Sequence, residues 1–145
     1  MGEFKCDFRK ERPKWAGTFR HIPYLSHAEL AKLLPTCTAF VLPSLEEGFA
    51  RVVSEAMASG RPIVATYESG ATTLVKDGVE GFIVRVRDPM HIAEAMIRIA
   101  TDAELNRRMG EAVYQKGAVR NTCRIMPTAC WRNTSAAWKA GVFLK

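Results

Sequence analysis

The chain contains 145 residues, of which 48% are hydrophobic, and it carries a formal net charge of +6. This length suits one domain with one sizeable hydrophobic core. The basic excess lies at the two ends, because residues 21–119 hold ten basic and twelve acidic residues. The charge distribution therefore indicates no basic face on the folded core, and we expect no nucleic-acid partner.

The four cysteines form no Cys-x-x-Cys pair and have no companion histidines at the spacing of zinc ligands. Reduced thiols in a cytosolic protein are the simplest interpretation. The longest apolar runs are too short to span a bilayer, and residues 1–5 lack the apolar core of a signal peptide. We therefore expect a cytoplasmic chain without a bound metal.

Residues 1–18 are charged and aperiodic, and a short strand over 16–21 is the only element that we expect near them. Ser26 and Glu29 then form a capping-box pattern at the start of a helix that ends before Pro35. The apolar face of this helix consists of Leu30, Leu33 and Leu34.

The unbroken apolar run 39–42, which Pro43 ends, predicts a parallel strand buried on both faces. A helical stripe follows, made of Phe49, Val52, Val53, Ala56 and Met57. Gly60 and Pro62 stop this helix, because glycine tolerates a left-handed cap and proline cannot continue a helix. The next strand is predicted over 63–65.

After Thr66 a small-residue loop is expected to open a short helix, and a further strand is predicted over 81–84. Asp88 and Pro89 predict the start of the next helix. Its expected apolar face is Ile92, Ala93, Met96, Ile97 and Ala100. A second capping box, Thr101 to Glu104, begins a last helix that runs to Gly117 with Leu105, Met109, Ala112 and Val113 on one face.

Strands that alternate with helices at these intervals indicate parallel βαβ units. The predicted fold class is α/β, with an open, mostly parallel, Rossmann-like sheet and helices on both faces. Met90, Met96 and Met109 are expected to fill the core.

Two glutamates, Glu47 and Glu55, are spaced as Glu-x7-Glu after the first buried strand. Their flanks read Pro-Ser-Leu-Glu-Glu-Gly-Phe and Glu-Ala-Met-Ala-Ser-Gly-Arg-Pro. This pattern resembles the signature of retaining GT-B glycosyltransferases of family 4, also called group 1. The resemblance covers about residues 19–121 and implies the C-terminal, donor-binding half of a GT-B fold. Independently, open α/β sheets bind ligands at the carboxyl ends of their strands, where Glu47 would lie.

The resemblance implies that Glu47, the catalytic candidate, faces the donor sugar and that Glu55 binds the ribose hydroxyls. An ionised carboxylate only accepts hydrogen bonds, which suits hydroxyls on adjacent carbons. The alternative is structural, with Glu47 a solvated loop charge and Glu55 paired with Arg51 at i, i+4.

The donor diphosphate is expected next to Gly48, where the absence of a side chain lets a phosphate approach the backbone amides of Phe49, Ala50 and Arg51. A plain turn glycine is the structural alternative. Ala50 and Arg51 depart from the usual Glu-Gly-Phe-Gly-Leu pattern of the family, so the Arg51 side chain can equally meet a phosphate or solvent.

Two further segments match parts of the family that line the donor. His21 lies in the segment after which the nucleotide base packs, although a lone histidine is more often an ordinary loop residue. The second segment comprises Ser69, Gly70, Ala71 and Thr72, whose backbone groups would contact sugar or phosphate. A helix entry is the alternative for these small residues.

The family transfers a sugar from a nucleotide diphosphate to an acceptor with retained configuration, mainly by stabilising the departing diphosphate. The resemblance therefore implies a nucleotide-sugar donor and an unidentified glycan or lipid-linked acceptor. It implies no cofactor and no metal. It also implies at most peripheral attachment to the inner face of the membrane. The family's N-terminal acceptor domain and its phosphate-clamping Arg/Lys pair do not match residues 1–20, so a partner chain is one interpretation and a truncated fragment another. A non-catalytic nucleotide-sugar-binding module and an epimerase of the same fold are the rival functions.

Residues 122–145 contain no acid and no sustained period, unlike the closing helix of the family. One interpretation is a shifted reading frame near codon 123. With permitted codons, the neighbouring frame reads QDYADRLLAEY, which has the helical spacing and charges that the observed tail lacks. A divergent terminal segment is the alternative.

Overall fold

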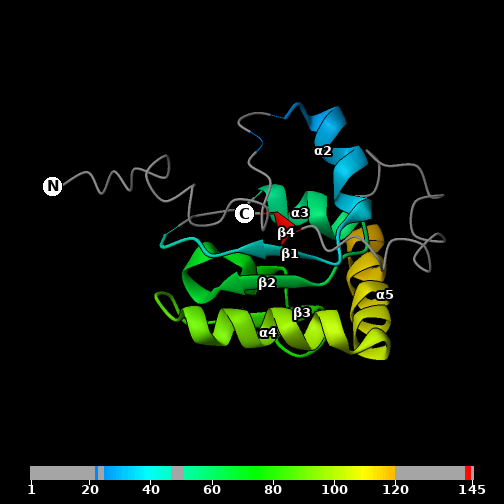
Figure 1. Cartoon of the computed structure of the whole chain (residues 1–145). Helices are drawn as coiled ribbons and strands as arrows, with labels where there is room; N and C mark the ends of the chain where they lie inside the picture. The colour runs from blue at the N-terminus through cyan, green and yellow to red at the C-terminus, as the bar shows by residue number, and fades with distance from the viewer. Residues whose placement is uncertain (1–21, 23–24, 47–50, 120–142, 145) are drawn as a thin grey trace, which may run out of the picture.

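The centre of the protein is a parallel sheet whose strands are the short apolar runs of the sequence. The computed structural model describes residues 22, 25–46, 51–119 and 143–144. Strands β1 (Ala39–Leu42), β2 (Ile63–Thr66) and β3 (Gly81–Val84) pair in parallel in the order β3-β2-β1 (Figure 1). Strand β4 (Phe143–Leu144) pairs in parallel with the other edge of β1.

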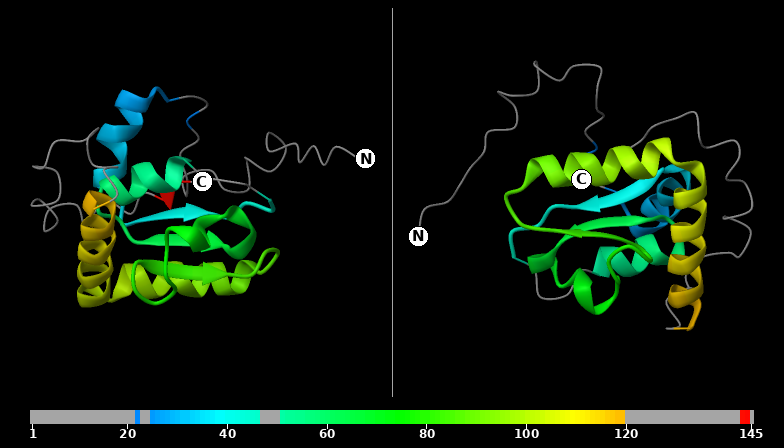
Figure 2. Two further views of the ribbon diagram at one scale, coloured as in Figure 1. Left: turned by 180° about the vertical axis from the view of Figure 1, so that it is seen from behind. Right: turned by 90° about the horizontal axis from the view of Figure 1, so that it is seen from below.

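Each face of this sheet is covered by one main helix, because successive strand residues point to opposite sides. Helix α3 (Arg51–Ala58) packs its Val53 and Met57 against Phe40 of β1. Helix α4 (Pro89–Thr101) packs its Ile99 against Val41 on the opposite face. Figure 2 shows α3 and α4 on opposite sides of the sheet. The expected open parallel sheet with helices on both faces is confirmed.

Helix α2 (His27–Leu33) begins where the capping box predicts it. The Ser26 side chain accepts from the Glu29 amide, and the Glu29 carboxylate accepts from the Ser26 amide. Leu30 packs against the same core cluster as α3, and the helix passes through a 3-10 turn (Leu34–Thr36) into β1. Helix α2 therefore lies on the α3 side of the sheet (Figure 1).

The stop signal after α3 is also confirmed. Gly60 adopts a left-handed conformation with φ of 65°, and its amide donates to the carbonyl of Met57. Pro62 then leads into β2. After β2 the expected short helix is replaced by two 3-10 turns, Tyr67–Ser69 and Ala71–Thr73.

The apolar face expected for α4 is partly wrong. The buried residues are Ala95 and Ile99, with Ile92 and Met96 packed beside them, whereas Ala93 and Ile97 are exposed. The sheet contacts α4 along one narrow face. The apolar stripe of the helix is wider than this face, so the residues at the edge of the stripe are exposed to solvent. Met90 is 68% exposed and is not core filler, unlike Met109.

Helix α5 (Ala103–Val119) starts one residue later than the capping box predicts. Thr101 is the last residue of α4, and its hydroxyl donates to the carbonyl of Ile97. Asp102 accepts from the amide of Leu105 instead. Asp102 caps α5 because α4 continues through Thr101 and leaves the aspartate as the first residue outside it.

Helix α5 closes the amino end of the sheet. Its Asn106 donates to the carbonyl of Thr38, the residue before β1, at 3.0 Å. A Cβ on Gly110 would lie 2.7 Å from the carbonyl oxygen of Gly60, so the helix and the loop before β2 are in close contact. Figure 1 shows α5 standing across this end. The opposite end, where the strands finish, is not covered by α5.

Two expectations concern parts of the chain without a described structure. The strand predicted over 16–21 lies outside the described residues, as does most of the tail 122–145. In that tail no secondary structure was expected, whereas Phe143 and Leu144 form β4. The shifted-frame interpretation stays a prediction.

Candidate functional site

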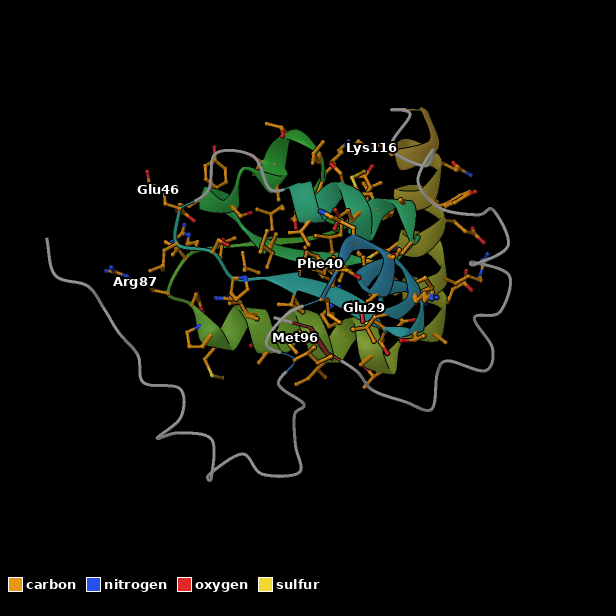
Figure 3. All side chains as sticks on the ribbon, turned by 90° about the horizontal axis from the view of Figure 1, so that it is seen from above. Glu29, Phe40, Glu46, Arg87, Met96 and Lys116 are labelled. Atoms are coloured by element: carbon orange, nitrogen blue, oxygen red, sulfur yellow. The ribbon has the colours of Figure 1, made fainter. Side chains whose placement is uncertain are left out.

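The loops that follow the strands meet at the carboxyl edge of the sheet. Residues 43–46 follow β1, residues 67–73 follow β2, and residues 85–88 follow β3. Figure 3 shows Glu46 and Arg87 at this same edge, away from α5. Parallel α/β sheets bind their ligands at such an edge.

A buried hydroxyl joins the first two of these loops. Thr66, at the end of β2, donates to the carbonyl oxygen of Ser44 at 2.5 Å. Leu45 and Tyr67, which follow on the two loops, are both mostly exposed. The edge therefore combines a fixed backbone with apolar side chains that are open to a ligand.

The acidic loop between β1 and α3 is only partly described. Glu47, Gly48, Phe49 and Ala50 lie outside the described residues, as do the side chain of Arg51 and the whole of His21. Glu46 is the last described residue before this gap, and Arg51, where α3 begins, is the first one after it. Contacts of these residues with a ligand stay predictions.

Glu55 lies about one turn into α3, and its side chain is 24% exposed. Its Oε1 lies 2.9 Å from Nδ1 of His27, a residue 84% exposed at the start of α2. Arg51 is the partner of Glu55 that the structural alternative predicts. The structure places His27 there, and the side chain of Arg51 lies outside the described residues.

The loop after β2 is held by its own serine. Ser69 is fully buried, donates to the carbonyl of Thr66 at 2.6 Å and accepts from the amide of Ala71 at 3.3 Å. Ala71 is also buried, Gly70 has a φ of 67°, and Thr72 is exposed. The side chains of Ser69 and Ala71 thus stabilise the loop, so only its backbone and Thr72 are open to a ligand.

A sequence profile described as glycosyl transferases group 1 matches residues 14–116. This match covers more than half of the chain and includes β1 to β3, α2 to α4, most of α5 and both glutamates. The chain belongs to the group 1 glycosyltransferase family.

Among its curated relatives is a D-inositol 3-phosphate glycosyltransferase from Nocardioides sp., which is 34% identical over 97 residues. That alignment covers 67% of this chain and 21% of the relative. The group 1 chain therefore spans about a fifth of the length of the curated relatives that it matches.

Two solved structures share the fold. A C-terminal domain of a group 1 family glycosyl transferase from Francisella tularensis has a TM-score of 0.70 and 23% identity, covering 83% of this chain and 65% of that one. A protein from Anabaena described in complex with UDP-glucose has a TM-score of 0.71 and 20% identity, covering 92% of this chain and 38% of that one. At these identities the likeness shows the GT-B fold alone. The expected domain limits at 19 and 121 stay a prediction.

The described part of the chain contains neither a metal-binding cluster nor a membrane-spanning helix. Across 22, 25–46, 51–119 and 143–144, no three His, Cys, Asp or Glu side chains are grouped so that they could hold a metal ion. Within the same ranges, no helix has the length and apolar character needed to cross a bilayer. Cys37 is buried and free, and its burial raises the pKa of the thiol.

The contact between His27 and Glu55 leaves no signal in the sequence. His27 is separated from Glu55 by 28 positions, and its own neighbourhood indicates only a helix start. No periodicity or motif links the two residues. The contact arises because α2 and α3 pack on the same face of the sheet.

Proposed function

We propose that this chain supplies the donor-binding part of a glycosyltransferase that moves a sugar from a nucleotide diphosphate sugar to an acceptor hydroxyl with retained configuration. The observation that carries the proposal is the Glu55 carboxylate, three-quarters buried on α3 just behind the carboxyl edge. An ionised carboxylate there can accept from the two hydroxyls of a ribose. Membership of the group 1 family and the UDP-glucose complex of the Anabaena neighbour support this donor class.

The proposed roles follow the order of the chain. Glu47 faces the donor sugar, and Glu55 holds the ribose. The amides of 48–51 receive the diphosphate at the start of α3, where free N–H groups and the helix dipole favour negative charge. The base packs near His21, and the loop 69–72 contacts the sugar or phosphate through its backbone.

The proposed chemistry needs positioning and charge stabilisation rather than a protein nucleophile. The leaving diphosphate accumulates negative charge, which the amides of 48–51 would stabilise. No cofactor or metal is included in the proposal. The acceptor would be held by the N-terminal domain of a longer protein or by a partner chain.

Calorimetric titration of the chain with UDP-, GDP- and ADP-sugars tests donor binding. We expect one of the three to bind, and the failure of all three would contradict the proposal. A transfer assay with the same donors, run with the acceptor-binding domain or partner chain present, separates the main rival, because a non-catalytic module would bind the donor without transferring its sugar.

A further inference from the structure

The pair formed by Glu55 and His27 joins a mostly buried carboxylate to an exposed imidazole. Glu55 is 24% exposed and His27 is 84% exposed, and Oε1 and Nδ1 lie 2.9 Å apart. The two residues come from different helices, so the contact depends on how α2 packs over α3 and not on a local helical repeat.

The direction of the hydrogen bond follows from the carboxylate. An ionised glutamate has no proton to give, so Nδ1 of His27 must carry the hydrogen and donate it to Oε1. This holds for the neutral Nδ1–H tautomer and for the imidazolium. The imidazole therefore orients the carboxylate in both of its charge states.

The carboxylate keeps most of its capacity after this bond. Its two oxygens offer about four lone-pair directions, and His27 uses one of them. The remaining directions suffice for both hydroxyls of a ribose. His27 can thus fix the plane of the carboxylate without taking the place of the diol.

The backbone of His27 is itself held firmly. His27 lies between Ser26 and Glu29, which form the reciprocal hydrogen bonds of the capping box. The Ser26 amide donates to the Glu29 carboxylate at 2.9 Å. These bonds to Ser26 lower the pKa of Glu29. Glu29 therefore stays engaged in the cap and leaves the His27 ring to Glu55.

We propose that His27 is a positioning residue of the donor site, holding the Glu55 carboxylate in the orientation that accepts both ribose hydroxyls. The proposal rests on the proposed function. His27 acts through Glu55, because a carboxylate that is already oriented loses less freedom when the ribose binds.

The test compares dissociation constants for UDP, GDP and ADP, using the nucleotide that the wild-type chain binds most tightly. His27→Ala should weaken its binding about three- to fivefold, the effect of losing one partly exposed hydrogen bond to the carboxylate. His27→Asn should restore most of the affinity, because its amide nitrogen can donate in the place of Nδ1. His91→Ala is the matched control, since His91 forms an equivalent exposed pair with Asp88 on α4.

The 2′,3′-dideoxy form of the same nucleotide separates positioning from general structure. Without the hydroxyls, the wild-type chain and His27→Ala should bind it equally. The role of His27 would be overturned if His27→Ala lost affinity equally for both nucleotides, or if its dissociation constant for the normal nucleotide were unchanged. Tighter binding by His27→Ala would also overturn it, because His27 would then compete with the ribose. If the wild-type chain bound none of the three nucleotides, the proposed function would fall and this role with it.

Discussion

At the scale of single residues, the two glutamates of the Glu-x7-Glu motif have different proposed duties. Glu55→Ala should weaken nucleotide binding by about 1.5–3 kcal/mol, because it removes charge-assisted hydrogen bonds to the ribose. Glu47→Ala should leave the affinity for the free nucleotide nearly unchanged and weaken binding of the full nucleotide sugar. Calorimetric titration of both ligands against both variants measures the difference.

The exposed Glu94 on α4 provides the control for these substitutions. Glu94→Ala removes the same charge from the opposite face of the sheet, and it should change neither affinity. If Glu47→Ala and Glu55→Ala reduced the affinity for free nucleotide equally, the division of roles would be wrong.

The pair formed by Asp88 and His91 predicts that the stability of the start of α4 depends on pH. The side chain of Asp88 bonds to Nδ1 of His91, which raises the pKa of His91 and lowers the pKa of Asp88. The charged pair therefore stabilises the start of α4 between these two pKa values. The histidine contribution is complete below the ordinary pKa of histidine, about 6.5, and is lost as the pH rises through the raised pKa of His91.

NMR titration of the His91 ring checks this prediction. The measured pKa should lie above about 6.5 and should fall in Asp88→Asn, which keeps a capping acceptor but removes the charge. A His91 pKa that does not respond to Asp88→Asn would show that the pair does not form in solution.

At the scale of elements, the amino end of the sheet depends on a close contact between α5 and the loop before β2. A Cβ on Gly110 would lie 2.7 Å from the carbonyl oxygen of Gly60, and a backbone oxygen cannot move aside as a flexible side chain can. Gly110→Ala should therefore destabilise the protein by about 1–3 kcal/mol. Chemical denaturation measures the change.

Gly117 in the same helix is the matched control. A Cβ there would meet Met57 at 3.4 Å or more, which is ordinary contact, and alanine favours a helix over glycine by about 1 kcal/mol. Gly117→Ala should be neutral or stabilising. Equal destabilisation by both substitutions would mean that the contact with Gly60 is not the cause.

A buried ion pair also joins α5 to the loop before β3. Glu80 is 6% exposed and accepts from Lys116 of α5 at 3.1 Å and from the amide of Lys76 at 2.6 Å. The Glu80 carboxylate thus has one hydrogen-bond donor from α5 and one from its own loop. This pair and the Gly110 contact hold α5 at the end of the sheet opposite the candidate site.

At the scale of the whole molecule, the shifted-frame interpretation of residues 122–145 makes a prediction about the gene. The coding DNA around codons 122–124 should contain a neighbouring frame that reads QDYADRLLAEY, and restoring one G before that frame should supply the Trp that precedes it. Restoring that frame should also raise solubility, because a closing helix would cover apolar surface of the domain. A stop codon in the neighbouring frame, or an unrelated sequence there, would make the interpretation wrong.

The sequence by itself determined most elements and the family. The apolar runs 39–42 and 81–84 are strands with the predicted bounds, and α2 begins at its capping box. Local signals suffice in these cases because buried strands need unbroken apolar runs and helix starts need a cap within three residues. The Glu-x7-Glu motif is equally local, and it led to the family that the profile match confirms.

Only the tertiary structure decided which of these elements touch. The contact between His27 and Glu55, the exposure of Ile97 on α4, and the position of α5 across the amino end all depend on how separate helices pack. Periodicity shows that a helix has an apolar stripe, but the width of the buried part is set by the neighbour that covers it. A pair 28 positions apart leaves no periodic signal, so the partner of Glu55 could be found only in the folded chain.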